Sequence, residues 1–256
     1  VEPLASLKTF ADAPRRLFCR GGALSLPPRE FSAWFPFACR LLVASRPSRF
    51  HTGKSALESL LSSALPAWRR LVAMTDDPGL LAEDGHFVVW ESSGSARRGR
   101  RFWLDADKGE ATVRDLTREE SARIGDLVAR VPVDGLRFDG TARVRDPGDM
   151  LSSLAKTFEA AGGEVRDATV ERIRIERNGA SLELEGGHRM EAGVIGVAAG
   201  VGSRSLLAPL GYRVPLIAER GYHIQADAPA WPDSPPVVFE DRSLIVSRFR
   251  SGLRAA

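Results

Sequence analysis

The residues whose types and spacing could do chemistry lie in one stretch, residues 193–211, with the sequence GVIGVAAGVGSRSLLAPLG. The apolar residues 194–197 predict a buried strand. Residues 198–200, which have almost no side chain, follow that strand, and Ser203 is placed to cap a short helix. Because no Cβ bulk stands in the way, such a bend allows close approach to the main chain. The group that packs against this bend is either a neighbouring strand or a nucleotide.

One nucleotide alternative is an NAD(P)-dependent dehydrogenase. Gly200 and Gly202 begin a run that nearly matches the Gly-x-Gly-x-x-Gly fingerprint, with Ser205 in place of the third small residue. Glu219 lies about 20 residues further on, where an acidic side chain could bind a ribose. The fingerprint normally opens its domain, whereas here a hairpin signal, Asn178-Gly179, precedes it. This alternative is therefore the less favoured one.

Composition excludes several classes of protein. The 256 residues carry a formal net charge of only +3, and no apolar run is long enough to span a membrane. Arg97, Arg98, Arg100 and Arg101 form the one basic cluster, which lacks interleaved aromatic residues. We interpret it as a solvated surface, with contact to an anionic membrane as the alternative, and expect no nucleic-acid partner. The two cysteines and four histidines show no disulfide framework and no metal-ligand spacing, so reduced thiols and no metal are expected.

The pattern of elements predicts a mixed α/β fold. Helices are expected over 29–45, through 57–71, over 92–108, after the capping box of Thr117 and Glu120, and over 150–161. Strands are expected over 86–91, within 133–144, over 170–177, 181–185 and 188–191, and within 214–226 and 237–248. An aromatic stripe on the first helix, which includes Phe31 and Phe35, is expected to be core.

Several motifs follow one another in a set order. They are LSLPP at 24–28, Trp34, RPSRF at 46–50, Asp146-Pro147 at a helix start, the strand and bend at 194–200, YRVPL at 212–216 and ERGYH at 219–223. This order resembles the FAD-dependent amino-acid oxidoreductases, the group of D-amino-acid oxidase and glycine oxidase, and is most similar to bacterial D-amino-acid dehydrogenase. The resemblance covers nearly the whole chain.

The resemblance implies an incomplete two-domain fold. Residues 1–138 would form the helical and strand part of a substrate domain, and 139–212 the central part of an FAD-binding domain. Residues 213–256 would continue the substrate-domain sheet. The segment with the family's glycine-rich turn for the FAD pyrophosphate is not in this sequence, so this chain alone is expected to bind FAD weakly or not at all.

The resemblance also implies which residues contact FAD. Val170 matches the valine whose backbone binds the adenine, and Ala198, Ala199 and Gly200 match an Ala-Thr-Gly turn that packs against the cofactor. Ala199 departs from the family's threonine, which puts one hydrogen bond in doubt. Close approach of a dinucleotide to the small-residue turn remains compatible with this sequence.

On the substrate side, Arg220 and Tyr222 would share one face of a strand, where they suit a substrate carboxylate. The alternative is a surface salt bridge and a tyrosine packed on the sheet, and the two remain open. No catalytic side chain is identified.

The resemblance implies oxidative deamination of D-amino acids to 2-oxo acids and ammonia by a dehydrogenase. It would act in the cytoplasm, peripherally on the plasma membrane, with a membrane quinone as electron acceptor. A non-catalytic fragment or binding module of the same fold is the alternative from another class.

Overall fold

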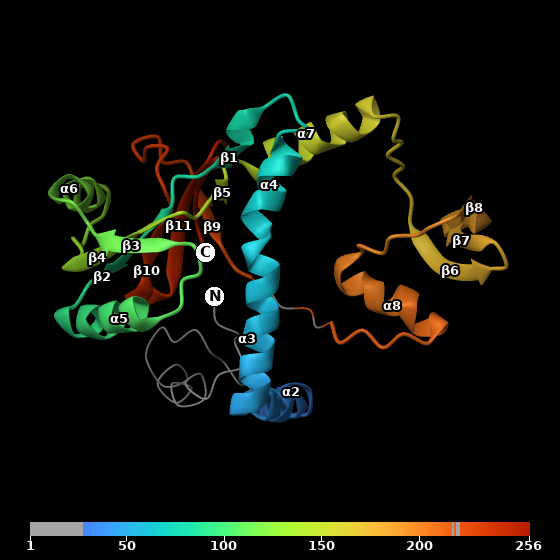
Figure 1. Cartoon of the computed structure of the whole chain (residues 1–256), viewed down its shortest axis with the longest axis horizontal. Coiled ribbons are helices and arrows are strands. Elements are labelled where there is room, and N and C mark those ends of the chain that lie inside the picture. The colour runs from blue at the N-terminus through green and yellow to red at the C-terminus, as the bar shows by residue number, and fades with distance from the viewer. Residues whose placement is uncertain (1–27, 217, 219–220) are drawn as a thin grey trace. The chain divides into compact units, whose positions relative to one another are not determined.

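The computed structural model describes residues 28–216, 218 and 221–256 of the chain. The chain divides into two compact units. The first comprises Val1–Leu154 and His223–Ala256, and the second comprises Ala155–Tyr222. Figure 1 shows helices and strands in both, which confirms the mixed α/β class.

A seven-stranded sheet forms the centre of the first unit, in the order β3-β4-β2-β10-β11-β12-β9. Its strands are β2 (His86–Trp90), β3 (Thr112–Asp115), β4 (Asp134–Asp139), β9 (Ile224–Ala226), β10 (Val237–Phe239), β11 (Leu244–Phe249) and β12 (Gly252–Ala255). All neighbours are antiparallel except β10 and β2, which are parallel. The strand expected within 237–248 is thus two strands, separated by the 3-10 turn η6 (Glu240–Arg242).

Strand β2 is buried on both faces. Phe87 and Val89 pack with Ile124 of helix α6 (Arg118–Leu127), whereas Val88 and Trp90 lie in the cluster of helix α5 (Ser93–Asp105). Since successive side chains on a strand point to opposite faces, the two helices cover opposite sides of the sheet. The capping box predicted for α6 is present, because the Thr117 hydroxyl accepts from the Glu120 N–H and the Glu120 side chain accepts from the Thr117 N–H.

Three consecutive helices follow the start of the described chain. They are α2 (Phe31–Ala44), α3 (Pro47–Ser62) and α4 (Ala64–Val72). Pro47 occupies the first helical position of α3, where proline lacks only an N–H that would be unpaired anyway. The expectation that the aromatic stripe of α2 is core is wrong, since Phe31 is 50% and Phe35 is 45% exposed. Helical spacing fixes which residues share a face, but only a neighbouring element can bury that face.

Helix α7 (Pro147–Ala160) leads from the first unit into the second. One carboxylate oxygen of Asp146 accepts from the N–H groups of Gly148 and Asp149 at the helix start. Its other oxygen accepts from the Arg250 N–H, 3.1 Å away. Asp146 therefore ties the beginning of α7 to the hairpin between β11 and β12. A short antiparallel pair, β1 (Leu81–Ala82) with β5 (Arg143–Val144), lies before this helix in the chain.

The second unit contains the predicted antiparallel meander, β6 (Val170–Glu176), β7 (Gly179–Leu184) and β8 (Arg189–Ala192). The strand predicted over 194–197 is wrong. This segment pairs with no described strand, and Val194 is 90% exposed. Four apolar residues favour a strand only if another strand supplies hydrogen-bond partners, and none among the described residues lies beside them.

A contact between α5 and β2 gives the first prediction. The indole Nε1 of Trp90 donates to Glu240, and a Cβ on Gly99 would lie 2.3 Å from that same nitrogen. Gly99→Ala should therefore destabilise the protein by about 1–2 kcal/mol in denaturant unfolding, because overpacking outweighs the gain in helix propensity. Gly94→Ala on the same helix is the control, since its Cβ would meet nothing closer than 3.6 Å. Equal stability of the two variants would contradict this packing.

A second prediction concerns His86 on β2. Its Nδ1 lies 3.0 Å from the Thr141 hydroxyl, and its ring stacks on Phe138 at 4.6 Å. Burial, followed by the charge of Arg137, lowers the pKa of His86 from its ordinary 6.5. The unfolded chain therefore binds this proton more readily, and the free energy of unfolding should fall as pH drops below about 6.5.

His86→Asn should remove part of this pH dependence, measured by urea unfolding at a series of pH values. The control is His51→Asn, because His51 is exposed on α3. A wild-type pH dependence unchanged by His86→Asn would refute the assignment.

Candidate functional site

The open bend at residues 198–200 is the centre of the candidate site. Ala198 and Ala199 are exposed, and Gly200 has a φ of +54°, a conformation that side chains rarely adopt. A Cβ built on Gly200 would meet no atom within 4 Å, and the same holds at Gly196. The main chain at this bend is therefore uncovered and accessible to a ligand.

The elements after the bend hold it in place. A 3-10 turn, η4 (Gly200–Gly202), continues into α8 (Ser203–Leu207), which contacts strand β6, and then into η5 (Ala208–Leu210). Gly211 ends this run with a left-handed φ of 85°. The prediction that Ser203 caps the helix is wrong, because Ser203 is its first helical residue and is buried.

Val170 lies in the same unit as the bend. It begins β6, pairs with Leu184 and is half-buried. A hollow of about 570 Å³ lies between β6 and η5, lined by Arg172, Ile173, Arg174, Ile175, Glu176, Pro209 and Leu210. Val170 is not among these lining residues. The structure thus places Val170 and the bend on elements that pack together, and the contact of each with FAD remains a prediction.

Charged groups beside this hollow are already paired with one another. Glu183 accepts from Arg174, and this hydrogen bond lowers the pKa of Glu183. Glu176 accepts from Arg189 at 2.6 Å and from the Ser181 hydroxyl at 2.9 Å. The side chains beside the hollow are thus engaged with one another by hydrogen bonds.

Of the two residues predicted to bind a substrate carboxylate, Tyr222 is the one that the structure describes. Arg220 lies outside the described residues. Tyr222 is 80% exposed and precedes β9, which begins only at Ile224. The expectation that Tyr222 is on a strand is therefore wrong, because strand pairing starts two residues later. The role of both residues stays a prediction.

Arg254 on β12 is a candidate that the sequence reasoning missed. Its guanidinium lies over the Phe249 ring at 4.9 Å, and its Nε is buried without a hydrogen-bond partner. Ser247 and Gln225 are its register partners on the adjacent strands. The sequence feature that could have pointed to Arg254 is an arginine inside a short segment of small and apolar residues. A half-buried cation without an acidic partner, within the part of the chain that is described, is suited to bind an anion.

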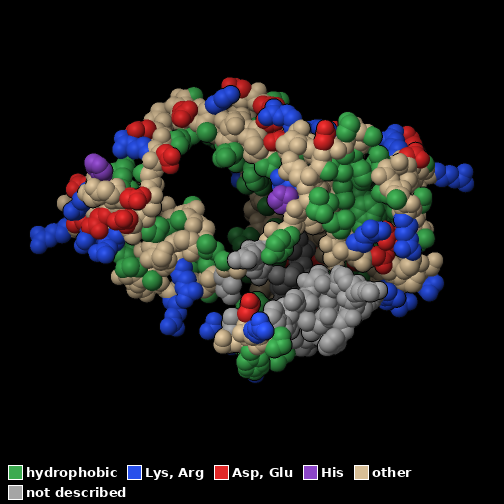
Figure 2. All heavy atoms as spheres, turned by 180° about the vertical axis from the view of Figure 1, so that it is seen from behind, with side chains coloured by type: hydrophobic (Ala, Val, Ile, Leu, Met, Phe, Trp, Pro, Cys, Tyr) green, Lys and Arg blue, Asp and Glu red, His purple; other side chains and the backbone are tan. Residues whose placement is uncertain are grey.

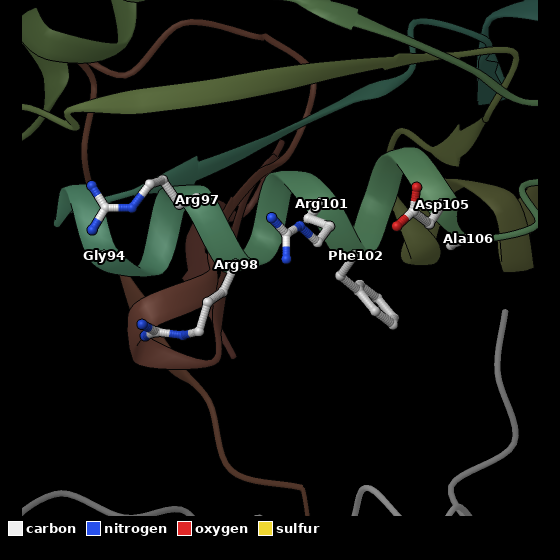
Figure 3. Close-up of a pocket in the computed structure, with 7 residues that line it drawn as sticks. All are labelled: Gly94, Arg97, Arg98, Arg101, Phe102, Asp105 and Ala106. Atoms are coloured by element: carbon white, nitrogen blue, oxygen red, sulfur yellow. The ribbon is translucent and has the colours of Figure 1, made fainter.

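The basic cluster on α5 separates into two kinds of arginine. Arg100 forms ion pairs with Asp134 at 2.9 Å and with Asp115 at 2.5 Å, so its role is structural. Figure 3 shows Arg97, Arg98 and Arg101 spread along the helix beside a hollow of about 730 Å³. These three are exposed and have no ion pair among the described residues. Their guanidiniums do not converge on one point, which agrees with the predicted solvated surface.

Two classes of site are not found in the part of the chain that the structure describes. No group of three or more histidine, cysteine or acidic side chains is arranged to hold a metal ion. None of the described helices combines the length and the hydropathy that crossing a bilayer requires.

Comparison with protein families decides between the two kinds of nucleotide site. The sequence profile of the family described as FAD dependent oxidoreductase (DAO) matches residues 19–254. The chain belongs to this family. FAD is the cofactor of the family, so the NAD(P) alternative from the glycine pattern loses its support, and the resemblance found in the sequence is confirmed.

Individual relatives are distant. The chain is 27% identical to a D-amino-acid oxidase of Bradyrhizobium diazoefficiens over 201 residues, which are 78% of this chain and 48% of that protein. Among solved structures, glycine oxidase from Geobacillus kaustophilus has a TM-score of 0.57 at 22% identity, covering 77% of this chain and 54% of that chain. L-proline dehydrogenase from P. horikoshii also has a TM-score of 0.57, at 15% identity, with 76% and 53% covered. The chain thus spans about half the length of these relatives.

Proposed function

We propose that this chain is the central part of an FAD-dependent enzyme that oxidises amino acids, with D-amino acids as the substrate class. The observation that carries the proposal is the uncovered bend at residues 198–200 in a chain of the FAD-dependent family. The named relatives support the class, since they include a D-amino-acid oxidase and a glycine oxidase.

The cofactor would lie against the backbone of Ala198, Ala199 and Gly200, with the Val170 backbone near its adenine. The bend fits such a group, because a Cβ at Gly200 meets only open space and the flanking alanines add little bulk. The chemistry that FAD would supply there is two-electron oxidation of the neutral amine form of the amino acid at Cα. The resulting imino acid would be hydrolysed by water to a 2-oxo acid and ammonia.

Arg254 would bind the substrate carboxylate, a role that its own surroundings support. Its guanidinium lies over the Phe249 ring, and the buried Nε lacks an acceptor. A carboxylate would supply that acceptor through a charge-assisted hydrogen bond. Arg220 and Tyr222 are further candidates for the same anion.

The electron acceptor would be a membrane quinone, making the enzyme a dehydrogenase. The motif order most similar to bacterial D-amino-acid dehydrogenase supports this choice over an oxidase that uses oxygen. Activity with a soluble quinone and no hydrogen peroxide in air is the expected result, and peroxide release at the same rate as deamination would favour the oxidase.

Filling the bend should block FAD binding without unfolding the protein. Purified protein carrying this chain is titrated with FAD, and flavin fluorescence quenching gives the Kd. Ala199→Trp should weaken binding at least tenfold, because the indole occupies the space that the cofactor needs. The control Ala161→Trp adds the same bulk at an exposed position after α7. Equal Kd values for both variants, with unchanged circular dichroism, would count against this site.

Replacing Arg254 should affect substrate binding more than turnover. Arg254→Met should raise KM for the amino acid at least tenfold with kcat nearly unchanged, because it removes one charged contact to the carboxylate. It should also weaken binding of benzoate, a carboxylate that does not react. Arg101→Met, an exposed arginine of α5, serves as control. Unchanged KM and unchanged benzoate binding in Arg254→Met would exclude this role.

A further inference from the structure

Phe249 and Arg254 lie close together near the hairpin that joins β11 to β12. Arg254 is the register partner of Ser247, and Phe249 lies two residues further along β11. The side chains of Phe249 and Arg254 therefore leave the same face of the sheet, on a diagonal that long and aromatic side chains can span. The Arg254 guanidinium lies over the Phe249 ring, 4.9 Å from its centre.

The turn of this hairpin is anchored at both of its residues, 250 and 251. The Arg250 N–H donates to the carboxylate of Asp146 at 3.1 Å. The Ser251 carbonyl accepts from the side-chain amide of Gln225, 2.9 Å away on the neighbouring strand β9. Because Phe249 directly precedes this turn, anchoring the turn also restricts where the Phe249 ring can lie.

Gly252, the register partner of Phe249, keeps the strands around Arg254 close together. Its φ is +134°, in the region that favours glycine, and a Cβ there would lie 2.7 Å from the Ala226 carbonyl oxygen. A larger residue would push β12 away from β9. With glycine at this position, Arg254 stays between β9 and β11.

Arg254 differs from other arginines of the sheet because it has a ring beside it but no acid. Figure 2 shows basic and acidic side chains intermixed over much of the surface, and many of them form ion pairs. Arg137 also lies over a ring, that of Phe87, but it forms an ion pair with Asp139 at 3.0 Å. Arg254 has no ion pair among the described residues, and its buried Nε has no acceptor. The Phe249 ring is therefore the contact that orients the Arg254 guanidinium.

We infer that Phe249 is a positioning residue, which orients Arg254 toward the substrate carboxylate. This inference rests on the function proposed above, in which Arg254 binds that carboxylate. An arginine loses rotational freedom when it binds a ligand, and a ring that already holds the guanidinium reduces this loss. The ring attracts the cation without neutralising its charge, so the cation stays available to a carboxylate. Phe249 thus acts on substrate binding and leaves the oxidation at Cα unaffected.

Kinetics and inhibitor binding test this inference on the purified, FAD-loaded protein that carries this chain. With D-alanine as the substrate, Phe249→Leu should raise KM about threefold to tenfold and leave kcat within about twofold. The Kd of benzoate, a carboxylate that does not react, should rise by the same factor. Phe249→Tyr keeps the ring and should restore the wild-type KM and Kd. Phe249→Met is a second variant without a ring, used if the leucine variant does not fold.

A double substitution separates positioning from a general effect on packing. In an Arg254→Met protein, Phe249→Leu should change KM and the benzoate Kd by no more than about twofold, because the ring then has no guanidinium to orient. The matched control is Phe87→Leu, which removes the ring beneath Arg137 and should leave both constants unchanged. Circular dichroism and the FAD content verify that each variant is folded and loaded.

The outcomes distinguish this inference from the proposed function. Unchanged KM and Kd in Phe249→Leu, or an equal increase in the Arg254→Met background, would overturn the inference. An increase in Arg254→Met without one in Phe249→Leu removes the positioning role alone. If Arg254→Met itself leaves both constants unchanged, the carboxylate role of Arg254 fails, and the positioning role of Phe249 fails with it.

Discussion

Burial of strand β2 on both faces is the constraint on which the first unit depends. Alternate side chains of four consecutive residues, 87–90, enter two separate clusters, one with α6 and one with α5. The parallel pairing of β2 with β10 joins a segment near residue 88 to one near residue 238, so the end of the chain completes the sheet. Arg254 lies on β12 of this same sheet, between its neighbours β11 and β9.

In the second unit, by contrast with the buried strand β2, the candidate site is a stretch of uncovered backbone. The three strands of its meander pair with one another through backbone hydrogen bonds. Residues 194–200, which follow the meander, pair with no strand among the described residues. Water can satisfy these exposed backbone groups, but the Val194 side chain is 90% exposed, and apolar surface left in water is unfavourable. In a family that binds FAD, and in a chain that spans about half the length of its relatives, such a segment is where further groups would pack.

Arginine distribution distinguishes structural from functional surfaces in this protein. Most arginines of the described sheets lie beside carboxylates, as Arg114 of β3 does with Glu120 and Asp139. Arg254 on the sheet lacks such a partner within the described residues, as do Arg40, Arg46 and Arg49 near the first helices. An unpaired cation costs little on a solvated helix but more when half-buried. Arg254 is therefore the arginine to which we assign a ligand, a small carboxylate.

The order of motifs along the sequence determined the family. Local sequence determined the meander with its turn at Asn178-Gly179 and the capping box of Thr117, because neighbouring residues along the chain supply all the groups involved. Tertiary structure decided whether an apolar pattern is buried. The stripe with Phe31 is exposed and residues 194–197 are unpaired, although both patterns predicted burial. Burial and strand pairing need a partner from elsewhere in the chain, and no spacing within a segment reveals whether that partner arrives. The same reason hid Arg254, whose isolation arises from strands that meet only in the fold.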